Sequence, residues 1–337
     1  MIFDNRFNKL TAKMNVSLSH KNRLKTKLTL IIIILSTYLS AYESWLLINP
    51  EARYAALAGA ATAIVNDVAA LYYNPAGLAN CNELSAAGNY GTWLGNSEIY
   101  YAGAVRNLKQ RGSLGTSLYL YNLDARLTGD EFSPTDFSYN YIYVCGGYAY
   151  NLTARIAVGV SLKIIYTNAP NPSIEGAQSI NGKGFSSDVG IQIKNLLPFL
   201  TIGKNHQSGL SFGAAFCNLG PAIKYRDDFS SYKSKLVRRL RIGSAWHLLD
   251  YDLIGATISY DFVKDYYESA LADQSESNSI GCAISLFNLL FIHGGQHYSA
   301  DEDYLTWGVA YDLDKFRISY CRYPTQKGNF FGVSYAF

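Results

Sequence analysis

Charged side chains stand at wide intervals in a stretch of the chain where apolar residues otherwise alternate with small ones. They are Arg155, Lys163, Asp188, Lys194, Arg239, Arg241 and Asp261. In an apolar setting, basic groups form charge-assisted hydrogen bonds with carboxylates. The charges could pair with one another and with the segment that precedes the strands, which we favour. Alternatively, the basic ones (Arg155, Lys163, Arg239 and Arg241) could receive the carboxylate of an apolar ligand.

Residues that could catalyse a reaction or hold a metal lack the spacing that such chemistry needs. His293 and His297 would lie about 13 Å apart along a strand, too far to share a metal ion. No G-x-S-x-G motif, phosphate-binding loop or metal-ligand cluster occurs. The five cysteines form no CxxC pair, so we interpret them as small apolar strand residues, with a disulfide between neighbouring strands as the alternative. We expect no enzyme, no metal and no cofactor.

The N-terminal segment, residues 1–41, has the order of features of a secretory signal peptide. Seven Lys or Arg side chains and one Asp precede an apolar run from Leu28 to Leu39, and Ser40 and Ala41 follow. The run is shorter than the roughly 20 residues that a membrane-spanning helix needs, although an anchor that is never cleaved is the alternative. Met1 or Met14 could be the start. Without this segment the net charge of +3 becomes −3, so nucleic-acid binding loses its support.

From residue 84 to 337 the chain alternates with a period of two. In Arg155–Tyr166, Ile156, Val158, Val160 and Leu162 share one face, and small or charged residues share the other. The fold class that this predicts is all-β, a transmembrane antiparallel barrel, because the outward residues of a soluble sandwich would be mostly charged. Fourteen strands are predicted: 84–93, 96–107, 112–122, 139–151, 154–166, 184–195, 207–218, 236–249, 252–264, 277–289, 290–299, 303–313, 315–323 and 328–337.

The connections and the C-terminus support a barrel of the bacterial outer membrane. The long connections 123–138, 167–183, 219–235 and 265–276 would lie at one end of the barrel and short turns at the other. The connection 196–206 is apolar and does not fit this rule. Phe337 and Tyr335 end an amphipathic last strand, which is typical of the signal read by the barrel-assembly machinery. Outer-membrane lipid and that machinery are the expected partners.

Residues 42–83 differ from the strands and predict a hatch inside the barrel. This segment is rich in Ala and Gly and contains the turn Asn74-Pro75-Ala76-Gly77. It is too polar and too small to face lipid, so it would fold inward and fill the barrel mouth.

Residues Ala52–Ala79 resemble the opening segment of the PorV/PorQ branch of the FadL-like outer-membrane proteins. Asn218-Leu219-Gly220-Pro221, Leu240-Arg241-Ile242-Gly243 and the aromatic C-terminus are further points of similarity. The resemblance implies a fourteen-stranded barrel with an N-terminal hatch, whose Asn-Pro-Ala turn corresponds to Asn74, Pro75 and Ala76. Leu57-Ala58-Gly59 departs from the usual Met-Gly-Gly.

Two functions follow from this resemblance. The first is a component of type IX-like protein secretion, which would contact exported proteins or secretion subunits; Tyr225, Phe229 and Tyr232 in a long loop could form the docking face. The second is a FadL-like transporter for hydrophobic small molecules, with a fatty-acid-like ligand and the hatch as gate. A barrel with a purely structural role is a third possibility.

Overall fold

The computed structural model describes residues 43–81, 84–94, 97–127, 135–170, 179–203, 209–226, 231–267, 274–300 and 302–336. The predicted signal peptide and the terminal Phe337 lie outside these residues, so both stay predictions.

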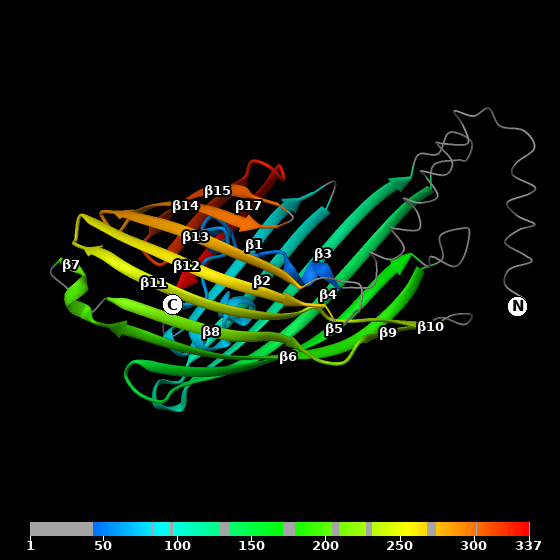
Figure 1. Ribbon diagram of the computed structural model, residues 1–337, viewed down its shortest axis with the longest axis horizontal. Coiled ribbons are helices and arrows are strands. Elements are labelled where there is room, and N and C mark those ends of the chain that lie inside the picture. Colours follow the sequence, from blue (N-terminus) through cyan, green and yellow to red (C-terminus); the bar gives the residue numbers. More distant parts are fainter. Residues whose placement is uncertain are drawn as a thin grey trace, which may run out of the picture. The chain divides into compact units, whose positions relative to one another are not determined.

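Fourteen long strands form one closed antiparallel barrel, as the alternation predicts (Figure 1). Each strand pairs with its neighbours in chain order, and the barrel closes where β1 pairs with both β2 and β17. The fourteen strands are β1 (Leu84–Trp93), β2 (Ser97–Asn107), β3 (Ser113–Leu127), β4 (Thr135–Asn151), β5 (Ile156–Pro170), β6 (Ser179–Leu196), β8 (Leu210–Leu219), β11 (Arg238–Asp250), β12 (Ile254–Tyr266), β13 (Ser275–Leu286), β14 (Leu290–Ser299), β15 (Tyr304–Leu313), β16 (Phe316–Tyr323) and β17 (Gly328–Ala336). All fourteen predicted strands are confirmed, with shifted boundaries.

The side chains of each strand divide between lipid and lumen. On β5, Val160 and Ile164 are 53% and 65% exposed, whereas Ser161 and Lys163 are 4% and 3% exposed. Apolar residues therefore form the outer surface, and small or polar residues face inward. This is the arrangement that a barrel needs in a bilayer, where closure also pairs every strand edge.

Strands β3 to β6 continue four or five residues beyond their predicted limits at the end of the barrel that carries the long connections. Polar cross-strand bonds hold the extension: the Tyr166 hydroxyl and the Asn168 amide both donate to the Asn181 side-chain oxygen, each at 2.9 Å. Because these side chains are polar, the apolar pattern ends before the ladder does, and the prediction stopped too early.

The two ends of the barrel differ. At the short-turn end, where β1 begins and β17 ends, the turns 152–155, 251–253, 287–289 and 314–315 join consecutive strands. The connection 197–209 at this end contains η4 (Pro198–Leu200) and β7 (Ile202–Gly203), and β7 pairs with the last residues of β11. Phe199 is 72% exposed beside the lipid-facing Trp246, whose indole donates to Leu200 O. Contact with lipid therefore explains the apolar composition of this connection, which the alternation of long and short connections does not explain.

The opposite end, called the long-loop end, carries a hairpin formed by β9 (Ile223–Arg226) and β10 (Ser231–Ser234). This hairpin lies within the long connection 219–235, and β9 extends the sheet by pairing with β6. Tyr225 of β9 is 3% exposed and its hydroxyl donates to Glu43 at 2.8 Å. The prediction that Tyr225 belongs to an outer docking face is therefore wrong. Phe229 lies outside the described residues, as does the side chain of Tyr232.

The hatch, residues 43–81, lies inside the barrel (Figure 1). Its helices are η1 (Ser44–Leu47), α3 (Ala52–Ala55), α4 (Ala70–Tyr73) and η2 (Pro75–Asn80), and η3 (Lys109–Arg111) lies in the β2–β3 turn. All its alanines are buried, because small side chains let its backbone pack closely against the wall. α3 packs against β15 to β17, and η2 against β4 to β6. Within the described ranges, no helix has the length and apolarity needed to cross a membrane.

Candidate functional site

The predicted hatch turn at Asn74 is bound directly to the barrel wall. The Asn74 amide nitrogen donates to Thr62 O within the hatch and to Ile191 O of β6, both at 2.9 Å. Its side-chain oxygen accepts from Ala76 N at 3.1 Å and so caps η2, which starts at Pro75. A fully buried asparagine thus satisfies both of its polar atoms and joins two arms of the hatch to one strand.

Glycines in the wall make room for this turn. A side-chain carbon added at Gly159 of β5 or Gly190 of β6 would come within 3.0 Å of Pro75 or Asn74. The two glycines are direct partners across β5 and β6. The same close approach to the hatch recurs on many other strands, at Gly103, Gly115, Gly147, Gly213, Gly243, Gly281, Gly295 and Gly308. The hatch is therefore in close contact with the wall along an arc from β2 to β15.

Single polar residues on the wall complete the attachment. The Asp261 carboxylate of β12 accepts from the backbone amides of Ala61 and Thr62 at 3.3 and 3.1 Å, and also from the Thr62 hydroxyl. The Gln192 side chain bonds to Asn80 and to Val65 O. The Thr306 hydroxyl donates to Ala56 O. These side chains replace the water that buried backbone groups would otherwise need.

The four basic residues predicted as candidate ligand partners differ in their surroundings: two form ion pairs, one is exposed in a turn, and Arg241 lies against aromatic rings. Lys163 of β5 lies in the lumen, where it pairs with Asp188 and its Nζ donates to the Asn218 side chain at 2.9 Å. Arg239 of β11 binds Asp265 through two hydrogen bonds of 2.7 Å. Arg155 is exposed in the turn between β4 and β5 and does not lie in the lumen, because the strand phase that would turn it inward starts only at Ile156.

Arg241 differs from the other basic residues. It is 3% exposed, and its guanidinium lies over the rings of Tyr72 and Tyr73 of the hatch, 5.4 and 5.2 Å from their centroids. Its Nε has no hydrogen-bond partner, and among the described residues it forms no ion pair. Arg241 is thus a buried cation held by aromatic faces.

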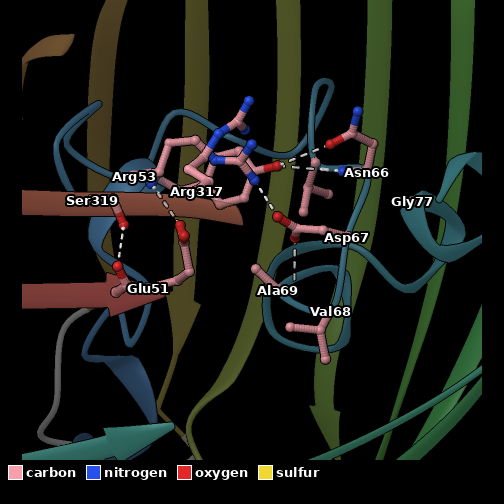
Figure 2. Close-up of polar contacts among 12 residues, drawn as sticks. Glu51, Arg53, Asn66, Asp67, Val68, Ala69, Gly77, Arg317 and Ser319 are labelled. Atoms are coloured by element: carbon pink, nitrogen blue, oxygen red, sulfur yellow. Dashed lines mark hydrogen bonds and ion pairs between the residues drawn. The ribbon is translucent and has the colours of Figure 1, made fainter. Parts of the chain in front are cut away.

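A polar pocket of 270 Å³ lies where the barrel closes, at the short-turn end. Hatch residues Arg53, Asn66 and Asp67 line one side; residues of β1, β16 and β17 line the other, including Arg317. Figure 2 shows Arg53 directed at Asp67, with which it forms an ion pair, while Asp67 also accepts from Ala69 N. The Arg53–Asp67 pair, called the clasp, joins α3 to the loop before α4 on the pocket side of the hatch.

Glu51 lies at the start of α3, next to the clasp (Figure 2). Its carboxylate caps the helix by accepting from Tyr54 N at 2.9 Å. Burial raises the pKa of Glu51 to about 7; Arg53 opposes this rise and Asp67 adds to it. The hatch therefore contains an acid that changes its charge near neutral pH.

The histidines occupy separate places on β14. His297 stacks on Tyr304 with 4.5 Å between ring centroids and bonds to the Ser279 hydroxyl, whereas His293 stacks on Phe291. In the part of the chain that the structure describes, no group of His, Cys, Asp or Glu side chains could hold a metal ion. The five cysteines are unpaired; Cys81 ends the hatch and is not a strand residue, while Cys282 faces outward.

The model of the Uncharacterised protein family (UPF0164) matches residues 40–312. The chain belongs to this family. No curated protein sequence matches the chain significantly.

Several solved structures share the fold of this UPF0164 chain. A monoaromatic hydrocarbon channel, CymD, superimposes with a TM-score of 0.59 at 11% identity, covering 86% of this chain and 98% of that one. The toluene transporter TodX of Pseudomonas putida gives 0.54 at 14% identity, covering 85% and 98%. A FadL homologue of Pseudomonas aeruginosa gives 0.55 at 11% identity, covering 85% and 98%. The FadL-like architecture is confirmed, while the PorV/PorQ branch stays a prediction.

Tyr335 follows the predicted outward phase of the last strand. It lies against Phe316 of β16, with ring centroids 4.5 Å apart, and Phe331 and Val333 of the same face are exposed. Its role in assembly of the UPF0164 barrel stays a prediction.

The sequence reasoning missed the clasp, the wall glycines and the polar wall residues Gln192 and Thr306. A usable signal existed for the glycines, since they recur at inward positions on most strands. No comparable signal marks Arg53 and Asp67, which are fourteen residues apart and meet only because the UPF0164 hatch folds back on itself.

Proposed function

We propose that this protein is a channel of the bacterial outer membrane that admits hydrophobic small molecules, with the hatch as its gate. Its outer surface fits a bilayer, and its fold is that of proteins described as a hydrocarbon channel and a toluene transporter. The short-turn end would then face the periplasm, as is usual for barrels of this membrane.

The uneven rim of the hatch is the observation that carries this proposal. From β2 to β15 the wall has no room for even one added carbon at many positions, whereas at β16, β17 and β1 a 270 Å³ pocket lies between parts of the hatch and the wall, beside the place where α3 packs. A plug that served only to seal the barrel would gain nothing from a pocket at its edge. We infer that the hatch yields on the pocket side and that solutes leave toward the periplasm there.

Arg241 supports an amphipathic solute such as a fatty acid. It is a buried guanidinium that forms no ion pair among the described residues, its charge acts on the Asp261 carboxylate of β12, and it lies at the hatch surface beside Tyr72. Lys163 and Arg239 already have carboxylate partners, so they are less suited to receive one from a ligand. Protein secretion was the first expectation from the sequence, but the buried Tyr225 removes part of the docking face that supported it.

Uptake by proteoliposomes tests the proposal. Vesicles with the protein should take up radiolabelled decanoate and toluene several-fold faster than empty vesicles, and a disaccharide no faster. Cysteines at positions 52 and 89, introduced in a chain without native cysteines, would tie the hatch to β1 on the pocket side, because Ala52 N lies 3.2 Å from Asn89 Oδ1. Oxidation should stop uptake and reduction should restore it; uptake equal to empty vesicles, or insensitive to the cross-link, would rule out a hatch-gated channel.

A further inference from the structure

Tyrosines cover one side of the lumen above the hatch. Six of them project inward from three adjacent strands, and we call them the tyrosine wall: Tyr101, Tyr119, Tyr121, Tyr139, Tyr141 and Tyr143. Tyr119 and Tyr143 face each other across β3 and β4 and stack with 5.0 Å between centroids and 7° between planes. Tyr121 is likewise opposite Tyr141. The wall therefore presents continuous ring surface to the lumen.

A tryptophan of the hatch is inserted into this wall. The Trp45 ring stacks on Tyr141, with centroids 5.1 Å apart and planes at 22°, and lies 5.7 Å from Tyr119 and 6.1 Å from Tyr143. It is 5% exposed, and its indole N–H donates to Glu43 at 2.7 Å. Three tyrosines thus form a slot that fits a flat two-ring system.

The segment that delivers Trp45 is held more loosely than the rest of the hatch. Residues 43–50 contain one short helical turn, η1. Apart from the 2.8 Å bond that the Tyr225 hydroxyl donates to the Glu43 side chain, the bonds to the barrel are few and long. They join Glu43 N to Lys235 O at 3.4 Å, the Tyr119 hydroxyl to Trp45 O at 3.3 Å, and Arg239 to Leu47 O at 3.2 Å. The Asn74 side chain, in comparison, makes two backbone bonds of 2.9 Å, one to the hatch and one to β6. The segment could therefore leave the slot while the turn at Asn74 stays in place.

We propose that the slot formed by Tyr119, Tyr141 and Tyr143 is a binding site for planar aromatic solutes, and that Trp45 occupies it until such a solute replaces it. This rests on the proposed channel function and names its substrate class. Stacked rings gain about 0.5–1.5 kcal/mol beyond the burial of their area. An aromatic solute can restore both the ring stacking and the buried area that are lost when Trp45 leaves the slot. A saturated solute restores only the buried area.

A polar group in the slot narrows the class further. The Tyr143 hydroxyl is buried and has no hydrogen-bond partner among the described residues, and the same holds for Tyr72 of the hatch. A buried hydroxyl without a hydrogen bond is energetically unfavourable. A ligand that forms a hydrogen bond with it therefore binds more tightly. The slot should therefore favour aromatic rings with a hydroxyl or ring N–H over plain hydrocarbons.

Binding to the full-length purified barrel tests this proposal with 2-naphthol and its saturated counterpart, decahydro-2-naphthol. Calorimetric titration of Trp45→Ala should show 2-naphthol binding about tenfold tighter than to the wild type, because no indole must be displaced. It should also bind about tenfold tighter than the saturated compound. Tyr141→Leu added to Trp45→Ala should remove that preference, because the ring that stacks on the ligand is gone.

The matched control is Trp246→Ala, which removes a lipid-facing tryptophan and should leave 2-naphthol binding as in the wild type. Equal affinity of 2-naphthol and decahydro-2-naphthol for a heat-modifiable, folded Trp45→Ala barrel would overturn the slot. Uptake of decanoate and toluene together with that result would keep the channel and discard the slot. Selective naphthol binding without any uptake would keep the slot and discard the channel.

Discussion

Two arcs of the barrel wall meet the same hatch in opposite ways. Along β2 to β15, glycines bring the wall backbone against the hatch, and Asn74, Asp261 and Thr306 fix it with hydrogen bonds. At β16, β17 and β1, α3 packs against the wall and Ala52 N donates to Asn89 of β1, but a polar pocket beside the clasp leaves this contact incomplete. Firm attachment of the hatch and its freedom to move can thus lie on different arcs of the same rim. The close-contact arc should determine stability, and the pocket arc should determine opening.

Gly190→Val should have the largest effect, because the new side chain would displace Asn74 from its seat. Overpacking together with the lost Asn74 bonds should cost about 4 kcal/mol of unfolding free energy. This loss can be measured by following the heat-modifiable, folded form over a series of denaturant concentrations. The control is Gly294→Val on β14, where an added carbon meets nothing within 4 Å. Similar losses in both variants would show that glycine matters for the strands and not for the hatch.

Asn74→Ala should come next. It leaves Thr62 O and Ile191 O without their donor in a buried site, which should cost roughly 3 kcal/mol. Amide hydrogen exchange should accelerate in η2 and α4 and stay slow in the strands. Asn66→Ala is the control on the pocket side, where the bonds between Asn66 and Tyr54 are both 3.4 Å long. If exchange rose equally in both variants, the two arcs would not differ.

The barrel could be predicted because few other folds account for fourteen segments that each alternate with a period of two. The hatch turn could be predicted because Asn-Pro followed by Gly is a local signal. Arg155 was misplaced because β5 begins one residue later, which leaves Arg155 in the exposed turn. The pairing of Arg239 with Asp265 and the stacking of Arg241 on Tyr72 depend on strand register and on the path of the hatch. The slot around Trp45 joins residues about 75 to 100 positions apart, which no local pattern encodes.

Glu51 should make the pocket arc sensitive to pH. Its folded pKa of about 7 exceeds its ordinary value of 4.5, so the folded chain holds a proton that the unfolded chain releases. This contribution, at most about 3 kcal/mol, is complete below pH 4.5 and is lost as the pH rises through 7. Arg53, Asp67 and Arg317 are the charges around it. Once exchange rates are corrected for their intrinsic pH dependence, the protection of α3 amides should fall between pH 5 and 8 in the wild type, and Glu51→Gln should remove that fall.

Asp67→Asn should have the smallest effect on stability and a clear effect on opening. The clasp is partly exposed, so losing its charge attraction should cost about 1 kcal/mol. Because the clasp holds the two arms of the hatch together beside the pocket, decanoate uptake should nevertheless rise several-fold. Glu276→Gln breaks an exposed pair with Lys264 at the long-loop end and should leave uptake unchanged. If Asp67→Asn lowered stability by as much as Asn74→Ala while uptake stayed constant, the clasp would belong to the close-contact arc, and the division of the rim would fail.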